Sequence, residues 1–216
     1  MLKPLRTVAR VALEKANLYS LVLLKQASFL SEIGWFQSYE QKQSIDRNGG
    51  PLPWVTYSMI AFLEPLLRRD LSVFEFGCGN STLWWAARVG RVVSVEHDAE
   101  WRMKIAPTLP PNAELHHVEL IRDGAYCRKA AEYPASFDLI SIDGRDRVNC
   151  AKNSLSALRP GGVILWDNSE REEYIPGTEF LKAQGFRRID FWGMGPINLG
   201  QSCTSIFYRT ENCLGI

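Results

Sequence analysis

The sequence predicts an α/β protein with a mostly parallel sheet covered by helices on both faces. From residue 73 onward, short apolar runs alternate with amphipathic segments, a pattern typical of strand–helix units in a parallel sheet. The run at 137–142 is nearly all apolar, as expected for a central strand buried on both sides. A glycine turn containing Gly77 and Gly79 follows the first run and leads into a helical pattern.

Five strand–helix pairs are expected in order along the chain. They are 73–76 with 80–88, 91–95 with 99–105, 114–118 with 124–132, 137–142 with 147–158, and 162–166 with 173–184. After Gly185 the pattern changes, because 186–191 and 203–208 resemble two strands joined by a loop rich in Gly and Pro. We therefore expect the sheet to have seven strands and to end in an antiparallel hairpin.

The N-terminal part differs in character from this alternating region. Residues 5–31 are expected to form one or two helices, and 38–50 a polar, irregular stretch. The segment that begins at Gly49-Gly50-Pro51 marks a boundary, followed by a helix over 57–67. This divides the chain into an N-terminal helical cap or lid, 1–50, and a single compact core, 51–216. The aromatic residues Trp35, Phe36 and Trp54 either close over the site as a lid or belong to the core.

Composition indicates an ordinary globular protein. The 216 residues carry a formal net charge of +1, which gives no reason to expect a nucleic-acid partner. The five cysteines are scattered without a C-x-x-C pair, so we expect reduced thiols and a cytoplasmic protein. No apolar run reaches the length of a transmembrane helix. The N-terminal helix mixes basic and apolar residues, so it is partly buried, forms a homodimer or contacts a membrane surface peripherally.

The glycine turn has the features of a cofactor site. Glycines let a ligand approach bare backbone at the start of a helix. Glu96 ends the next strand, 21 residues after Glu75, where an acidic residue holds ribose hydroxyls in nucleotide-type sites. The sixth position of the turn is Thr82, so the dinucleotide fingerprint G-x-G-x-x-G is incomplete. This departure argues against NAD.

Instead, the sequence from Glu75 to Ser81 is similar to motif I, E-x-G-x-G-x-[ST], of the class I S-adenosylmethionine-dependent methyltransferases. The resemblance extends over about residues 54–209 and implies a Rossmann-like fold with an antiparallel terminal hairpin. It also implies S-adenosylmethionine as cofactor, with His97 beside the adenine and Glu119 holding the adenine amino group. The expected cofactor-binding residues are Glu75, Gly77, Cys78, Gly79, Ser81, Glu96, His97, Glu119 and Asp143.

The last two strands before the hairpin end in Asp143 and in Asp167-Asn168. Their spacing resembles that of metal-dependent O-methyltransferases of the catechol and caffeoyl-CoA type. The resemblance implies that these three residues face the acceptor as the catalytic group and bind Mg²⁺ or Ca²⁺. That family has a lysine base three residues after the first Asp, where this chain has Asp146. Either another base serves the metal, or the metal is absent and Asp143 or a histidine is the base.

The arginines Arg145, Arg147 and Arg171 fall on loops at the same edge. They either bind a carboxylate or phosphate on an anionic acceptor or form ordinary ion pairs with acidic neighbours. The expected reaction is O-methylation of a hydroxyl on a small molecule or sugar. A non-catalytic S-adenosylmethionine-binding or assembly module, an aminopropyltransferase-like enzyme and a nicotinamide-dependent dehydrogenase are the alternatives.

Overall fold

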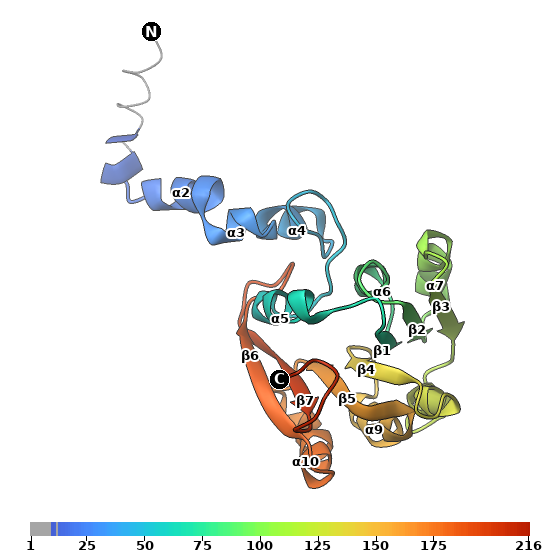
Figure 1. The fold of residues 1–216 in the computed structure, drawn as a ribbon. Coiled ribbons are helices and arrows are strands. Elements are labelled where there is room, and N and C mark those ends of the chain that lie inside the picture. The colour runs from blue at the N-terminus through green and yellow to red at the C-terminus, as the bar shows by residue number, and fades with distance from the viewer. Residues whose placement is uncertain (1–9, 12) are drawn as a thin grey trace.

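The computed structural model describes residues 10, 11 and 13–216. A seven-stranded sheet with the order β3-β2-β1-β4-β5-β7-β6 lies at its centre (Figure 1). β7 is antiparallel to both of its neighbours, and the other pairings are parallel. The strands are β1 (Ser72–Phe76), β2 (Arg91–Glu96), β3 (Ala113–His117), β4 (Phe137–Ile142), β5 (Leu158–Asp167), β6 (Arg187–Gly193) and β7 (Ser202–Tyr208). The predicted fold class, including the terminal hairpin, is confirmed.

Helices follow the strands as the alternation predicts, although several are shorter. The expected helices at 124–132 and 147–158 each divide into a short α-helix and a 3-10 turn. The α-helices are α2 (Tyr19–Ala27), α3 (Phe29–Glu32), α4 (Trp35–Gln41), α5 (Tyr57–Leu63), α6 (Asn80–Ala86), α7 (Ala99–Ile105), α8 (Ala125–Arg128), α9 (Arg147–Asn153) and α10 (Ile175–Ala183). The 3-10 helices are η1 (Glu64–Leu66), η2 (Ala106–Thr108), η3 (Lys129–Glu132), η4 (Leu155–Ala157) and η5 (Glu172–Tyr174).

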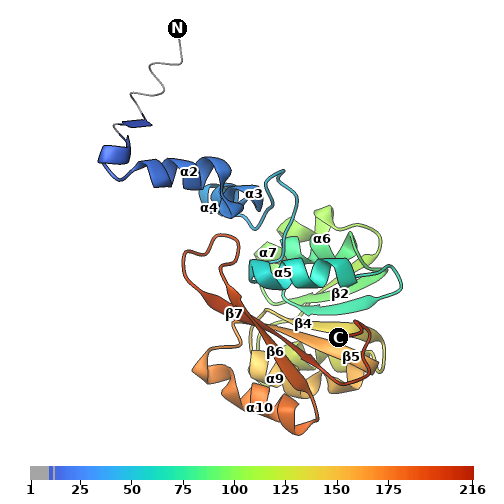
Figure 2. The ribbon, with the colours of Figure 1, turned by 60° about the vertical axis from the view of Figure 1, so that its left-hand side comes forward.

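Two apolar cores lie on opposite faces of the sheet. Alternate side chains of each central strand point to opposite faces. On β4, for example, Leu139 joins the core that packs against α5 and α6, whereas Ile140 joins the core beneath α8, α9 and α10. Figure 2 shows α5 and α6 above the sheet and α9 and α10 below it. Burial on both faces explains why the central strands are apolar throughout.

The N-terminal helices are attached to the core mainly through α4. Trp35 of this helix is buried in the same cluster as Leu52 and Tyr57. Helix α4 runs to Gln41, so the irregular stretch expected from residue 38 begins later than predicted. Helix α2 points away from the sheet (Figures 1 and 2) and contains no buried residue. Part of the helix expected over 5–31 lies outside the described residues.

Residues described here form no helix that is both long and apolar enough to cross a bilayer.

Candidate cofactor and acceptor site

The register of the parallel strands brings the predicted site residues to one edge of the sheet. Phe76 pairs with Ile142, and Ile142 pairs with Trp166. The residues that follow these positions, Gly77, Asp143 and Asp167, therefore lie side by side at the carboxyl edge of the sheet. Glu96 ends β2 at the same edge. The carboxyl edge of an open parallel sheet is where such folds bind ligands.

The glycine turn packs directly against the loop after β4. Gly77 has a φ of +99°, which favours glycine, and its N–H donates to the Val95 carbonyl at 2.8 Å. A Cβ on Gly144 would lie 2.1 Å from the Tyr126 hydroxyl and 3.0 Å from the Gly77 nitrogen. The close approach of these loops therefore depends on the absence of a side chain at residue 144.

Glu75 supports this turn from below. Its side chain is buried, and its Oε2 accepts hydrogen bonds from the Thr82 hydroxyl at 2.5 Å and the Ser94 hydroxyl at 2.8 Å. Thr82 Oγ1 also accepts the Gly79 N–H at 3.1 Å. Burial raises the pKa of Glu75. The residue in place of the third glycine thus links the carboxylate to the turn, a role that the sequence interpretation of Thr82 missed.

Glu96 is held by the backbone of two loops. Its Oε1 accepts the N–H groups of His97 at 2.7 Å and Asp98 at 2.9 Å, and its Oε2 accepts the Cys78 N–H at 3.2 Å. A carboxylate offers about four acceptor positions. One position on Oε2 therefore remains for a ribose hydroxyl, whereas two hydroxyl contacts were expected.

Two buried polar atoms beside Glu96 have no hydrogen-bond partner among the described residues. They are Nδ1 of His97 and the hydroxyl of Tyr126. Nδ1 lies 2.7 Å from Glu96 Oε1 but makes no hydrogen bond with it. The two rings meet edge to face with centroids 6.0 Å apart. Because unpaired buried polar groups are costly, these atoms fit a polar heterocycle such as adenine. Nothing in the sequence pattern marked Tyr126.

Trp101 and Glu119 differ in how their side chains contact the rest of the protein. The Trp101 indole N–H donates to the Cys78 carbonyl at 2.8 Å, so α7 is fastened to the turn. Glu119 is exposed, two residues beyond the end of β3. Its side chain makes no hydrogen bond or ion pair within the described part of the chain, so its adenine role stays a prediction.

Arg147 lies between the carboxylates of Asp143 and Asp167. Its Nη2 donates to Asp143 Oδ1 at 3.0 Å, and its Nη1 lies 3.6 Å from Asp167 Oδ2. Asp167 Oδ1 also accepts the Thr204 hydroxyl at 2.7 Å, because Asp167 and Thr204 are paired between β5 and β7. Burial and the adjacent Asp167 raise the pKa of Asp143, against the opposing effect of Arg147.

The predicted metal ligands are two carboxylates and one amide, and the guanidinium of Arg147 contacts both carboxylates. Within residues 10, 11 and 13–216, three His, Cys, Asp or Glu side chains nowhere come together as metal donors. Asn168 has a φ of +53°, and its side chain makes no hydrogen bond within the same residues. A guanidinium already lies between the two carboxylates, so the donor set does not fit Mg²⁺ or Ca²⁺ in this arrangement.

The three arginines also separate into two groups. Arg147 is buried and fully engaged, so it does not point to an acceptor as one interpretation of the sequence proposed. Arg145 and Arg171 are exposed, and neither side chain forms an ion pair in the part of the chain described. Acidic neighbours therefore do not neutralise these two guanidinium groups, and both are available to bind another anion.

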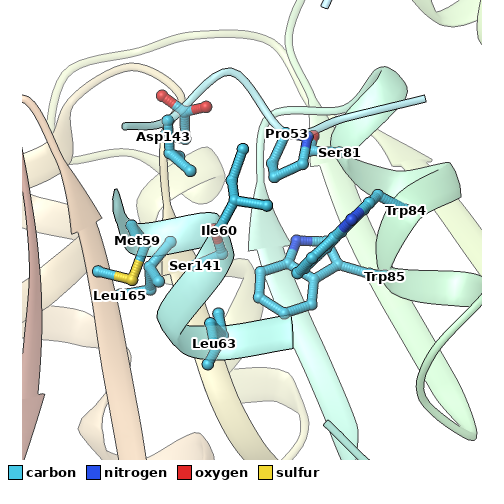
Figure 3. A pocket seen from close by; sticks show the side chains of 11 residues that line it. Pro53, Met59, Ile60, Leu63, Ser81, Trp84, Trp85, Ser141, Asp143 and Leu165 are labelled. Atoms are coloured by element: carbon cyan, nitrogen blue, oxygen red, sulfur yellow. The ribbon is translucent and has the colours of Figure 1, made fainter. Parts of the chain in front are cut away.

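A small apolar cavity opens beside Asp143. Its volume is about 10 Å³, room for roughly one water. Figure 3 shows Asp143 and Ser81 at its upper end, and Met59, Ile60 and Trp85 along its wall. Asp143 therefore stands where a polar loop meets an apolar wall, between the cofactor turn and α5.

The loop between β6 and β7 is fastened to the N-terminal part next to this cavity. The backbone carbonyl of Asn198 accepts the Trp35 indole N–H at 2.8 Å, and its side chain accepts the Trp54 N–H at 3.2 Å. Trp35 is buried, whereas half of Trp54 is exposed. Trp35 therefore belongs to the core, and Trp54 alone of the two has the exposure of a lid residue.

Comparison with known families gives a direct match to the central part of the chain. Residues 74–169 match a family model described as a methyltransferase domain. This range contains the glycine turn, Glu96, Asp143 and Asp167. No curated protein matches the sequence.

Solved structures share the fold at low sequence identity. A precorrin-8w decarboxylase from Methanobacterium thermoautotrophicum is 18% identical, with a TM-score of 0.51 over 78% of this chain and 97% of that one. A precorrin-6y C5,15-methyltransferase from Geobacter metallireducens is 16% identical, with a TM-score of 0.52 over 69% and 86%. A spermidine synthase from Thermotoga maritima is 15% identical, with a TM-score of 0.51 over 74% and 59%. These likenesses show the fold alone.

Proposed function

We propose that the chain is a class I S-adenosylmethionine-dependent methyltransferase, as its methyltransferase-domain match over residues 74–169 suggests, and that it methylates a hydroxyl oxygen of a small molecule or sugar. The observation that carries this proposal is the position of Asp143. Its carboxylate lines the small apolar cavity beside the cofactor turn, and it would remove the proton of the acceptor hydroxyl.

The cofactor part of the proposal uses the groups around the glycine turn. S-adenosylmethionine supplies, when bound, a methyl group on a sulfonium. The bare backbone after Gly77 would hold its amino-acid part, Glu96 would accept a ribose hydroxyl, and the unpaired atoms of His97 and Tyr126 would bind the adenine. These buried acceptors and donors favour a nucleoside over a purely apolar ligand.

Asp143 is the best-placed general base among the acidic groups at this edge. Asp167 is more deeply buried and already bonded to Thr204. Asp143 uses Oδ1 for Arg147 and leaves Oδ2 without a hydrogen bond in the described residues. Burial raises its pKa, which makes it a stronger base than an exposed carboxylate. It would take the hydroxyl proton as the oxygen–methyl bond forms and the sulfur–methyl bond breaks.

Arg145 and Arg171 favour an acceptor that carries a negative charge. Both are exposed at the acceptor edge without ion pairs in the described chain, and a guanidinium binds a carboxylate or phosphate through two hydrogen bonds. An Arg145→Ala variant should lose turnover of anionic acceptors far more than of neutral ones. Equal losses on both would count against an anionic acceptor.

Calorimetry with S-adenosylmethionine, S-adenosylhomocysteine and NADH tests the cofactor, and a methylation screen of hydroxyl compounds tests the reaction. We expect binding of the first two ligands only, and turnover that Asp143→Asn abolishes while S-adenosylhomocysteine binding persists. Aminopropyl transfer to a polyamine in the same screen would replace the proposal with the aminopropyltransferase alternative. Binding without turnover of any acceptor would favour the non-catalytic one.

A further inference from the structure

We propose that Arg147 takes the place of a divalent cation at this site, so that methyl transfer here needs no metal. The proposal rests on the proposed function for its catalytic meaning, but its structural part stands separately. It replaces the metal-bound triad of Asp143, Asp167 and Asn168 with a carboxylate–guanidinium–carboxylate bridge.

All the nitrogens of the Arg147 guanidinium have partners at the ends of β4 and β5. Nε donates to the Gly144 carbonyl at 3.0 Å, and Nη2 donates to the carbonyl and the Oδ1 of Asp143, both at 3.0 Å. Nη1 donates to the Asp167 carbonyl and lies 3.6 Å from its Oδ2. All three guanidinium nitrogens are therefore engaged at the ends of β4 and β5.

Arg147 is also buried. Only 8% of Arg147 is exposed, and its Cζ lies 5.5 Å from the centre of the Tyr174 ring. A metal ion between the two carboxylates would have to displace this guanidinium and leave its charge buried without a carboxylate partner. Breaking a buried ion pair from one side is strongly unfavourable, so the arginine excludes the metal.

The bridge through Arg147 also holds the carboxylate of Asp143 in place. Arg147 joins two neighbouring strands, which a bound cation would otherwise do, and it fixes Oδ1 of Asp143 while Oδ2 stays free. Arg147 is thus a positioning residue for the proposed base. Arg147→Lys would lose the planar fork of donors, because a lysine has one cationic nitrogen. It would keep the positive charge beside the two carboxylates.

Titration of the purified protein with Mn²⁺, followed by electron paramagnetic resonance, and with Ca²⁺, followed by calorimetry, tests the proposal. We expect no saturable binding up to millimolar metal for the wild type, Arg147→Lys or the exposed control Arg145→Ala. Arg147→Ala should acquire a site that Asp167→Asn removes again. Metal binding by the wild type that Asp167→Asn abolishes would overturn the proposal, as would a folded Arg147→Ala variant without metal affinity.

If Arg147→Ala does not fold, as judged by circular dichroism, the wild type and Arg147→Lys still decide the question. S-adenosylhomocysteine is titrated into the same samples with and without EDTA. Wild-type affinity that EDTA leaves unchanged supports the proposal, whereas affinity that requires added metal overturns it. If S-adenosylhomocysteine does not bind at all, the proposed function is rejected. The metal titration alone then decides the proposal about Arg147.

A separate observation concerns α2 and the residues that flank it. This segment points away from the sheet (Figures 1 and 2), and none of its helical residues is buried. Leu21 is 59% exposed and Phe29 64%, and Leu18, Leu23 and Leu24 are also exposed. Exposed apolar side chains gathered in one segment indicate a partner that covers them.

We infer that this partner is the surface of an anionic membrane. The chain has 25 basic and 24 acidic residues, and its first 28 residues contain five of the former and one of the latter. Positive charge beside exposed apolar side chains matches anionic headgroups and the acyl chains beneath them.

Sedimentation with vesicles of phosphatidylcholine, with and without phosphatidylserine, tests this inference on the full chain. We expect binding only to the anionic vesicles, lost in high salt, in Lys15→Glu and in the Leu21→Ser/Leu24→Ser double variant. Met103→Ser changes an exposed apolar residue on α7 and should bind like the wild type. Absence of vesicle binding, or a dimer in light scattering that Leu21→Ser/Leu24→Ser dissociates, would overturn the inference.

Discussion

The hydroxyl of Thr82 lies 2.5 Å from Oε2 of Glu75, deep beneath the cofactor turn. This hydrogen bond connects the first turn of α6 to β1, and the same hydroxyl accepts the N–H of Gly79. A hydroxyl can donate to the carboxylate and accept from the backbone at once. The position that lacks the third glycine therefore holds the turn in shape from inside the protein.

Thr82→Val removes both hydrogen bonds while keeping the side-chain shape. We expect the free energy of unfolding to fall by about 1–3 kcal/mol, because a buried carboxylate loses a partner. S-adenosylhomocysteine should also bind more weakly, because the turn is no longer held. Urea denaturation and calorimetry measure the two effects. Thr82→Ser should restore both, and a fully stable Thr82→Val would contradict this role.

Glu96→Gln should weaken S-adenosylhomocysteine by at least about tenfold, or about 1.4 kcal/mol. The side-chain amide of glutamine has only one acceptor oxygen, whereas both oxygens of Glu96 accept backbone N–H groups. Its NH₂ group would therefore face a backbone N–H, and two donors cannot form a hydrogen bond. Glu100→Gln, an exposed change on α7, is the matched control. Calorimetry checks both variants, and unchanged affinity in Glu96→Gln would remove Glu96 from the ribose site.

Gly144→Ala should destabilise the protein by about 1–3 kcal/mol through overpacking. The new methyl group would clash with the Tyr126 hydroxyl and push the loop away from Gly77. Cofactor affinity should fall with stability, because both loops line the same site. Gly200→Ala is the control, since a Cβ there meets nothing within 4 Å. Thermal melting and calorimetry compare them, and similar behaviour of the two variants would refute the close packing.

The thiol of Cys213 should make stability depend on pH in the alkaline range. Burial raises its pKa to about 11, whereas an unfolded cysteine titrates near about 8.5. Between these values the unfolded chain has lost a proton that the folded chain keeps, so stability falls as pH rises. We expect the free energy of unfolding to fall more steeply between about pH 8 and 11 in the wild type than in Cys213→Ser, as measured by denaturation. Parallel curves would disprove it.

Much of the fold followed from local patterns. The alternation of apolar runs and amphipathic segments predicted the strands, and the absence of a helix after Gly185 predicted the terminal hairpin. Helix lengths were less accurate: the 147–158 segment, for example, ends its α-helix at Asn153. A single residue can end a helix through contacts that periodicity does not show.

The sequence by itself predicted a methyltransferase fold and the place of its cofactor turn, because the glycine turn and the spacing from Glu75 to Glu96 are local properties of the chain. It also placed Asp143 and Asp167 at the same edge, since parallel strands share a direction. Only the tertiary structure decided what lies between those carboxylates. Arg147 reaches Asp167, 20 residues away in sequence, across the β4–β5 pair. The direction of a long side chain depends on the strands, carbonyls and rings around it, and that environment exists only once the chain has folded.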